Sequence, residues 1–173
     1  INGTLATYAP NQDFNGSDSF TFVVSDGELT DTASVTLTIT PINDAPILTT
    51  LSDIVFNEDE NSLVTLSGND VDGDDLIFNI SGGIEIEATL DNNVVFLVSP
   101  LNFNGSESFT AIVSDGELSD SQSFTVTVTA VNDAPVAQDV SGSGIEGGTI
   151  STTLKATDVD DTNVNDFSFT VLN

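Results

Sequence analysis

The sequence predicts an all-β protein of tandem Greek-key β-sandwiches, and three observations carry this prediction. Apolar residues alternate with Thr and Ser along several segments, as in Phe124, Val126 and Val128, which is typical of strands with one buried face. Asn-Gly and Asp-Gly pairs, such as 26–27 and 115–116, separate these segments and favour short turns. Whole stretches of sequence also return along the chain at one nearly constant interval.

The interval between the repeated stretches is 89 residues for three matches and 88 for two more. The matches at 89 residues are 14–21 with 103–110, 25–29 with 114–118, and 43–46 with 132–135. Glu58 and the stretch 70–72 return 88 residues later as Glu146 and 158–160. We therefore expect one complete repeat over 46–134. The C-terminal half of a repeat, at 1–45, precedes it, and the N-terminal half of a third, at 135–173, follows it.

Within the complete repeat, seven short strands are expected, and no segment has a helical period. They are placed near 47–56, 62–67, 75–81, 84–89, 93–98, 107–114 and 119–130. Seven short strands in under ninety residues favour a two-sheet Greek-key sandwich. In the first half repeat, Phe20, Phe22 and Val24 show the same alternation, and so do Val35 and Leu37.

The repeats meet at the two Asn-Asp-Ala-Pro stretches, 43–46 and 132–135, where one strand-like run ends and another begins. Proline cannot donate a hydrogen bond to a sheet and restricts the residue before it to extended conformations. These stretches therefore read as joints between domains.

The net charge of −27 comes from 28 acidic residues opposed by a single base, Lys155. Such a chain will not bind nucleic acid or an anionic membrane through charge. Two explanations remain, a halophilic surface and cation binding. Scattered charge is expected of the first, whereas here the acidic residues crowd two loops: Asp70, Asp72, Asp74 and Asp75 in one, and Asp158, Asp160 and Asp161 in the other.

Other features of the composition also limit the possibilities. The chain has no Cys, so disulfides cannot brace the fold. No apolar run approaches the ~20 residues of a membrane helix. Because Ile1 stands in the middle of a repeat, we expect the chain to be an internal piece of something longer. The two half repeats are then completed by a longer array or, in a second account, by a neighbouring molecule in a head-to-tail fibre.

The order of the motifs identifies a resemblance. The motifs are Glu58-Asp59-Glu60, Asp70-Val71-Asp72, Val113-Ser114-Asp115-Gly116 and Val131-Asn132-Asp133-Ala134-Pro135. This order resembles that of a cadherin repeat. The unit is most similar to the cadherin-like tandem repeats of large bacterial surface proteins, including RTX-type adhesins. The resemblance extends over the whole chain.

The resemblance implies Ca²⁺ at the joints, held by the base of one domain, the linker and the top of the next. The ligands it implies at the first joint are Asp13, Asn43, Asp44, Asp70, Asp72 and Asp115. Those at the second joint are Glu58, Asn102, Asn132, Asp133, Asp158 and Asp160. Asp26 and Glu146 hold the same motif positions in the flanking repeats, and Asp26 belongs to a joint before Ile1.

Two departures from the animal cadherin pattern predict fewer or weaker ions. Pro41 and Ala130 stand where those linkers begin with Asp, and the extra Asn after the Asn-Asp pair is missing. The third repeat also has Gly147 and Gly148 where the second has Asp59 and Glu60.

Chemistry favours Ca²⁺ without the resemblance. Two unpaired carboxylates ~4 Å apart repel by roughly 1 kcal/mol in water and about 4 kcal/mol near a protein surface. The loop 70–75 holds four carboxylates with no nearby base in the sequence, and calcium prefers oxygen ligands. An EF-hand is excluded because Asp75 and Ser81 occupy the places that require Gly and Glu.

These observations predict a non-catalytic extracellular spacer on a bacterial cell surface, stiffened by Ca²⁺. Its partners are the neighbouring repeats of the same chain or fibre, and glycans would be bound by regions outside this segment. A carbohydrate- or protein-binding module is the alternative, although the chain has no Trp and one Tyr, Tyr8. With no His, Cys or Arg, only a paired-carboxylate hydrolase remains among enzymes, and the repeated placement of the acidic groups disfavours it.

Overall fold

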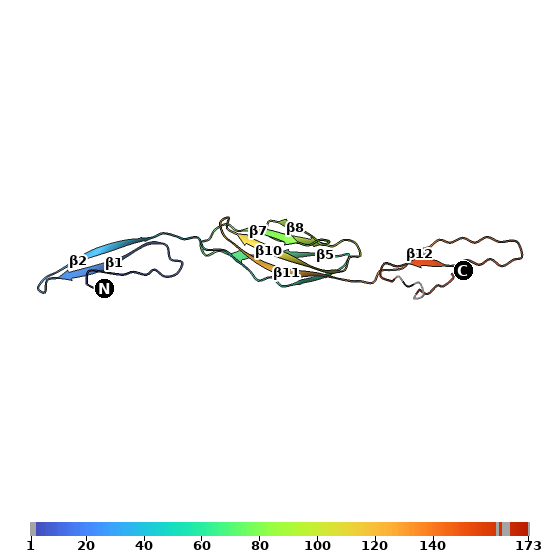
Figure 1. The fold of residues 1–173 in the computed structure, drawn as a ribbon, viewed down its shortest axis with the longest axis horizontal. Helices are drawn as coiled ribbons and strands as arrows, with labels where there is room; N and C mark the ends of the chain where they lie inside the picture. Colours follow the sequence, from blue (N-terminus) through green and yellow to red (C-terminus); the bar gives the residue numbers. More distant parts are fainter. Residues whose placement is uncertain (1–2, 162, 164–166, 173) are drawn as a thin grey trace.

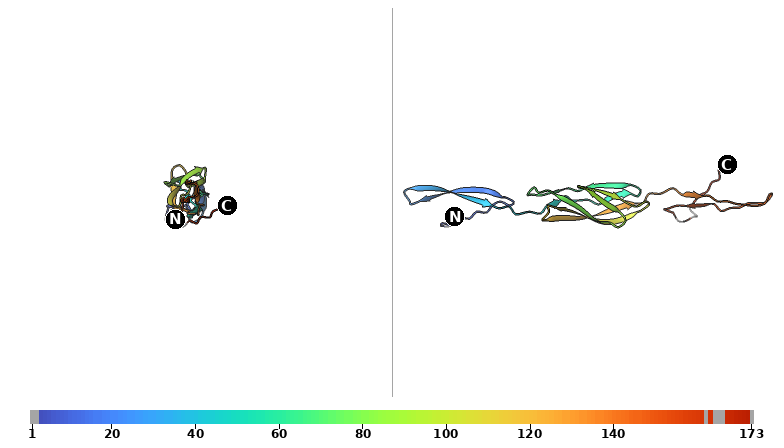
Figure 2. Two further views of the ribbon diagram at one scale, coloured as in Figure 1. Left: turned by 90° about the vertical axis from the view of Figure 1, so that its right-hand side faces the viewer. Right: turned by 90° about the horizontal axis from the view of Figure 1, so that it is seen from above.

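The computed structural model describes residues 3–161, 163 and 167–172. Parts of the expected half repeats 1–45 and 135–173 lie outside these ranges. Three parts of the chain lie end to end along one long axis, with a narrow cross-section (Figures 1 and 2). The middle part, which we call the central unit, spans residues 46–134.

The central unit is a sandwich of two sheets, as the sequence predicts. The pairing is antiparallel except for one parallel pair at the edge of one sheet, which the sequence pattern does not predict. One sheet has the order β4-β11-β10-β7, and the other has the order β5-β9-β8. The first consists of β4 (Ile54–Asn57), β11 (Ser119–Thr129), β10 (Gly105–Ser114) and β7 (Ile77–Gly82). The second consists of β5 (Asn61–Thr65), β9 (Val94–Val98) and β8 (Glu87–Asp91), and a small pair joins β3 (Ile47–Leu48) to β6 (Gly68–Asn69).

The core lies between the two sheets of the central unit. Alternate residues of β10 and β11 point inward, so that Phe109, Val113 and Val126 are at most 1% exposed. Val95 and Leu97 of β9 meet them from the other sheet with no exposed surface. The period-two alternation of the sequence therefore identifies the buried face of these strands correctly.

The strand expected over 47–56 is two short strands, β3 and β4, and this is a correction to the sequence prediction. Between them the backbone leaves the ladder because a side chain takes its hydrogen bonds. The Leu51 N–H donates to Gln122 Oε1 at 3.0 Å, and Gln122 Nε2 donates to the Leu51 carbonyl at 2.8 Å. The chain thereby crosses from the small β3-β6 pair to the edge of the large sheet, where β4 pairs in parallel with β11.

The strand expected over 84–89 begins three residues later, as β8 at Glu87. The backbone N–H groups of residues 84–86 are not available to a sheet because the Glu107 carboxylate accepts all three. The donors Ile84, Glu85 and Ile86 lie at 2.8, 3.0 and 3.1 Å. These hydrogen bonds hold the pKa of Glu107 below its usual value, against the opposing effect of burial.

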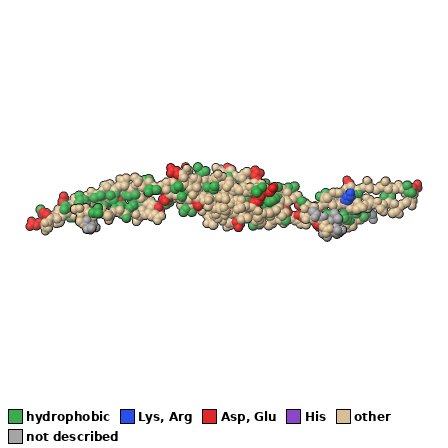
Figure 3. All heavy atoms as spheres, viewed as in Figure 1, with side chains coloured by type: hydrophobic (Ala, Val, Ile, Leu, Met, Phe, Trp, Pro, Cys, Tyr) green, Lys and Arg blue, Asp and Glu red, His purple; other side chains and the backbone are tan. Residues whose placement is uncertain are grey.

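The outer parts of the chain are small hairpins. β1 (Gly16–Ser25) pairs with β2 (Thr30–Ile39), and Phe20 lies opposite Val35 just as Phe109 lies opposite Phe124 in the central unit. At the other end, β12 (Val136–Gln138) pairs with β13 (Lys155–Thr157). The apolar side chains of the first hairpin form a row along its surface in Figure 3, and Phe22 is 41% exposed.

Within the described residues no segment is helical, and no helix is therefore long and apolar enough to cross a membrane.

Candidate metal centre

The first joint is the stretch 41–46 together with the loops that contact it, and it is fixed mainly by the central unit. The Asn43 side-chain amide donates to Asp115 Oδ2 at 2.9 Å. The Asp44 backbone N–H donates to Asp72 Oδ2 at 2.8 Å, and Pro46 is fully buried. The linker thus follows the top of the central unit through two of its predicted ligand residues, Asp72 and Asp115.

The loop that follows β6 is an acidic turn organised by Asp70. Its Oδ1 accepts the backbone N–H groups of Asp72 at 2.8 Å and Gly73 at 3.1 Å, and Oδ2 is buried with no partner. One carboxylate oxygen each from Asp70, Asp72 and Asp74 lie within 4.8 Å of one another. The turn therefore directs three acidic groups to one place without a base between them.

Asp13 reaches the first joint from the other side. It lines one hollow together with Asp44 and Asp72. Desolvation raises the pKa of Asp44, and the negative charges of Asp13, Asp72 and Asp70 raise it further, in that order. The first joint is thus a place of electrostatic repulsion in the absence of a cation.

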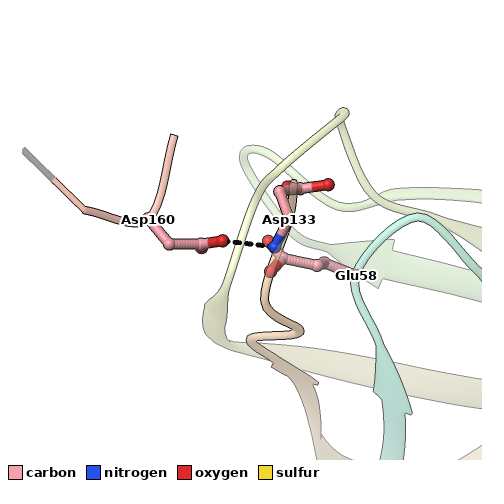
Figure 4. Close-up of side chains that lie close together, drawn as sticks. All are labelled: Glu58, Asp133 and Asp160. Atoms are coloured by element: carbon pink, nitrogen blue, oxygen red, sulfur yellow. Dashed lines mark hydrogen bonds between the residues drawn. The ribbon is translucent and has the colours of Figure 1, made fainter. Parts of the chain in front are cut away.

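The second joint is the stretch 130–135 with its neighbours, and its acidic residues come from three segments. Glu58 follows β4, Asp133 belongs to the linker, and Asp160 lies in the loop after β13. Figure 4 shows the Asp160 carboxylate directed at the Asp133 backbone, with Glu58 beside it. One carboxylate oxygen from each residue lies within 4.8 Å of the others, and Asp160 Oδ2 accepts the Asp133 N–H at 2.6 Å.

Two oxygens of this joint are buried and have no hydrogen-bond partner, Glu58 Oε2 and Asp133 Oδ2. Burial raises the pKa of Asp133, and the charges of Asp59, Asp160, Glu58 and Asp158 add to the rise. Buried carboxylate oxygens without a donor are costly unless a cation neutralises them. The second joint therefore holds two buried oxygens whose negative charge nothing in the described part of the chain offsets.

The remaining predicted residues of the second joint lie around this cluster. Asp158 Oδ1 accepts the N–H groups of Asp160 at 2.9 Å and Asp161 at 3.1 Å, as Asp70 does in the equivalent turn. Asn102 lines a hollow with Asp133 and Asp158. The Asn132 amide donates to the Asp133 carbonyl at 2.8 Å, and it thus differs from Asn43, which reaches a carboxylate.

Two predicted residues lie away from both joints. Asp26 Oδ1 accepts the N–H groups of Glu28 at 2.9 Å and Leu29 at 2.8 Å in the turn between β1 and β2, and these bonds lower its pKa. Glu146 is exposed in the segment between β12 and β13. For these two residues a metal role stays a prediction from the motif positions.

Two acidic residues at the joints are absent from the ligand sets drawn from the resemblance, Asp74 and Asp59. Asp74 belongs to the acidic group of the first joint, and the alternating Asp70, Asp72 and Asp74 were the signal for it. Asp59 lines the hollow of the second joint, and its Oδ1 accepts the Asn102 N–H at 3.1 Å. Asp59 belongs to the motif Glu58-Asp59-Glu60, and that motif was the signal for it, although its contact with Asn102 spans 43 residues.

The residues at both joints fit Ca²⁺. Every side chain in the two acidic groups offers oxygen, which calcium prefers, and none offers the sulfur or imidazole nitrogen typical of zinc sites. The buried, unpartnered oxygens of Glu58, Asp70 and Asp133 are the observation that supports the fit.

Comparison with known proteins gives one family match. The chain matches the family described as bacterial Ig domain over residues 1–38 and 43–129. The break between the two matched segments falls at the beginning of the first joint.

Individual relatives are larger proteins. The chain is 28% identical over 126 residues to chitinase A of Pseudoalteromonas piscicida, a match that covers 72% of this chain and 15% of the chitinase. Among solved structures, human protocadherin-24 EC1-2 is 25% identical at a TM-score of 0.49, covering 68% of this chain and 62% of that one. An endo-fucoidan hydrolase of glycoside hydrolase family 107 is 29% identical at a TM-score of 0.40, covering 68% of this chain and 19% of that one.

Proposed function

Because this chain belongs to the bacterial Ig domain family, we propose that it is a spacer segment of a large extracellular bacterial protein, stiffened by Ca²⁺ at its joints. The proposed role is mechanical. The sequence has no His, Cys or Arg, and the two groups of close carboxylates among the described residues lie at the joints.

The observation that carries the proposal is the second joint. Glu58, Asp133 and Asp160 come from the base of the central unit, the linker and the following segment. A cation bound by all three would connect the segments on either side of the linker. The buried oxygens of Glu58 and Asp133 supply the free-energy reason for binding it.

Without a cation, each joint is a short acidic linker held by a few hydrogen bonds and strained by carboxylate repulsion. Asp44 hydrogen-bonds to Asp72, and Asp133 to Asp160, so each linker already contacts the segment that follows it. When bound, the cation supplies charge neutralisation. The residues of the chain then restrict rotation about the linker, because ligands from both sides share one ion.

Two kinds of parent protein are consistent with such a spacer. One is an adhesin of the RTX type, in which a row of repeats holds a glycan-binding tip away from the cell surface. The other is a secreted polysaccharide-degrading enzyme, and the similarity to chitinase A over 126 residues favours that setting. In both, the segment separates functional domains and does not itself bind substrate.

The partner that the geometry supports is a neighbouring repeat. The inward-facing residues of β10 and β11 are covered by β5, β9 and β8, whereas their counterparts Phe22 and Val24 on the first hairpin are exposed. Phe22 and Val24 line an apolar hollow. We propose that the early strands of a repeat, from the same chain or another copy, cover this face. The mass of the 173-residue chain at several concentrations distinguishes monomers from head-to-tail polymers.

The experiment that tests the spacer function is a calcium titration of the whole chain, followed by calorimetry and small-angle X-ray scattering. We expect dissociation constants typical of extracellular calcium sites, on the order of 0.1–1 mM for the weakest ions. We also expect calcium to narrow the distribution of overall shapes. A chain that shows no heat and no change in scattering at 10-fold higher calcium, on the order of 10 mM, contradicts the proposal. Tighter binding of Zn²⁺ than of Ca²⁺ contradicts the assignment of the metal.

A further inference from the structure

Glu58 occupies an unusual position at the end of β4. Among the residues that the structure describes, it is the only charged side chain in the buried class, at 3% exposure. β4 pairs in parallel with β11 through Asn57 and Thr129, and the Glu58 N–H donates to the Thr129 carbonyl at 2.9 Å. At that point the backbone pairing between the two strands ends.

The Glu58 side chain continues the pairing beyond this end. Its Oε1 accepts the Val131 N–H at 2.6 Å, the position at which the chain leaves the sandwich for the linker. One carboxylate oxygen therefore anchors the base of the linker to β4. The second oxygen, Oε2, is buried without a partner. One carboxylate oxygen of Glu58 also lies within 4.8 Å of one oxygen each of Asp133 and Asp160, and Figure 4 shows the three side chains together.

The two oxygens of Glu58 thus have different tasks, and the carboxylate connects them. Oε1 anchors the linker through Val131, Oε2 is left without a hydrogen-bond partner, and the carboxylate as a whole lies beside Asp133 and Asp160. A buried carboxylate with one unmatched oxygen costs free energy in the cation-free chain, and neighbouring negative charges add to that cost. The same group stabilises the chain once a cation removes the mismatch.

We propose that Glu58 is a positioning residue that couples cation occupancy of the second joint to the stability of the central unit itself. In this role Glu58 destabilises the central unit in the cation-free chain and stabilises it once a cation is bound. The inference rests on the proposed function, since it requires a cation at this joint. It extends that function from the stiffness of a linker to the folding of the neighbouring sandwich.

The decisive variant is Glu58→Gln. Glutamine keeps a carbonyl oxygen for the Val131 N–H, removes one buried negative charge, and places an N–H donor among the acidic oxygens. The matched control is Glu60→Gln, which removes the same charge from an exposed side chain on the same turn. A second variant, Glu58→Ala, removes both the acceptor of the Val131 N–H and the buried negative charge.

The test is thermal unfolding of the full chain by calorimetry, in chelator and in millimolar calcium, with amide hydrogen exchange at Val131. In chelator we expect Glu58→Gln to raise the Tm by about 4–8 °C over the native chain, and Glu60→Gln to leave it nearly unchanged. We expect calcium to raise the Tm of the native chain and of Glu60→Gln, with most of that rise lost in Glu58→Gln. Protection of the Val131 amide persists in Glu58→Gln and is lost in Glu58→Ala.

The outcomes separate this inference from the proposed function. A native chain whose Tm and scattering do not respond to calcium overturns the proposed function, and the coupling with it. A native chain that responds, with Glu58→Gln retaining the full response, overturns the coupling alone. A Glu58→Gln chain that is less stable than Glu60→Gln in chelator also overturns it, because Glu58 would then stabilise the cation-free state.

Discussion

The side-chain amide of Asn43 donates a hydrogen bond to Asp115 Oδ2 at 2.9 Å across 72 residues of sequence. Asp115 Oδ1 accepts the N–H groups of Glu117 and Leu118, both at 2.7 Å, in the turn between β10 and β11. A single carboxylate therefore organises the turn at the top of the central unit and attaches the linker to it. The linker is thus hydrogen-bonded to the central unit on this side without a cation.

This arrangement predicts that the pKa of Asp115 lies below its usual value. The turn N–H of Leu118 lowers its pKa most, followed by the Asn43 amide. Because the pKa in the folded chain lies below that of the unfolded chain, the contribution of Asp115 to stability is present at neutral pH. It is lost as the pH falls through the folded value.

We expect Asn43→Ala to raise the pKa of Asp115 only part of the way to its ordinary value, because the turn hydrogen bonds remain. Carboxyl chemical shifts followed through an acid titration in chelator measure it. Asp26 has the same turn bonds without an Asn partner, and its pKa should be unaffected. An equal change at both residues would contradict the assigned contact.

The two joints should respond independently to mutation. Asp72 accepts the Asp44 N–H at the first joint, and Asp160 accepts the Asp133 N–H at the second. We expect Asp72→Ala to loosen only the first joint in calcium, and Asp160→Ala only the second, since repeats interact with their nearest neighbours.

Because the chain has no Cys, pairs of spin labels can be placed cleanly for this measurement. Labels on the exposed Thr32 and Thr89 report on the first joint, and labels on Thr89 and Ser151 report on the second. The width of each distance distribution is the readout. Equal broadening of both distributions by either substitution would show that the joints are coupled.

The core of the central unit should tolerate little change. Leu97 has no exposed surface, so we expect Leu97→Ala to lower the free energy of unfolding by about 2–5 kcal/mol. Leu63 lies on the neighbouring strand β5 but is 61% exposed, and Leu63→Ala should remain within about 0.5 kcal/mol of the native chain. Denaturant unfolding in chelator compares the two, and similar losses would argue against the packing described.

Substitution of Gly83 should be costly for a steric reason. Its φ is +73°, and a Cβ there would lie 2.5 Å from the Ile86 carbonyl and 2.6 Å from the Phe109 ring. Gly73 has a similar φ of +83° but open space around it. We expect Gly73→Ala to cost about 1 kcal/mol and Gly83→Ala at least about twice as much, measured by denaturant unfolding in chelator. Equal losses would mean that the positive φ alone, and not the close contacts around Gly83, determines the cost of both substitutions.

The sequence predicts the parts of this fold that depend on local pattern. The alternation through Phe124, Val126 and Val128 identifies the buried face of β11, because residues two apart on a strand share a side. It does not reveal that Gln122 interrupts the strand near Leu51, or that Glu107 delays β8. Both effects come from side chains at least 21 residues away, which no local window contains.

In the candidate site, too, some features are predicted by sequence patterns and others are visible only in the folded chain. Repeated motifs place Asp72, Asp133 and Asp160 at the joints, because the repeat interval itself indicates shared positions. The hydrogen bond from the Val131 N–H to Glu58 is visible only once β4 lies beside the end of β11. The contact of Asp59 with Asn102 is likewise visible only in the folded chain.

The parallel pairing of β4 with β11 has a consequence for tension. The two linkers meet the central unit at opposite ends of the long axis (Figure 2). A pull on both linkers moves β4 and β11 in opposite directions along their length, so the four residue pairs between them bear the load together in shear. Strands loaded in this way must break several hydrogen bonds at once, whereas a hairpin pulled from its open end separates one pair at a time. The edge of the sheet that contains Glu58 is therefore where the resistance of this unit to extension is concentrated.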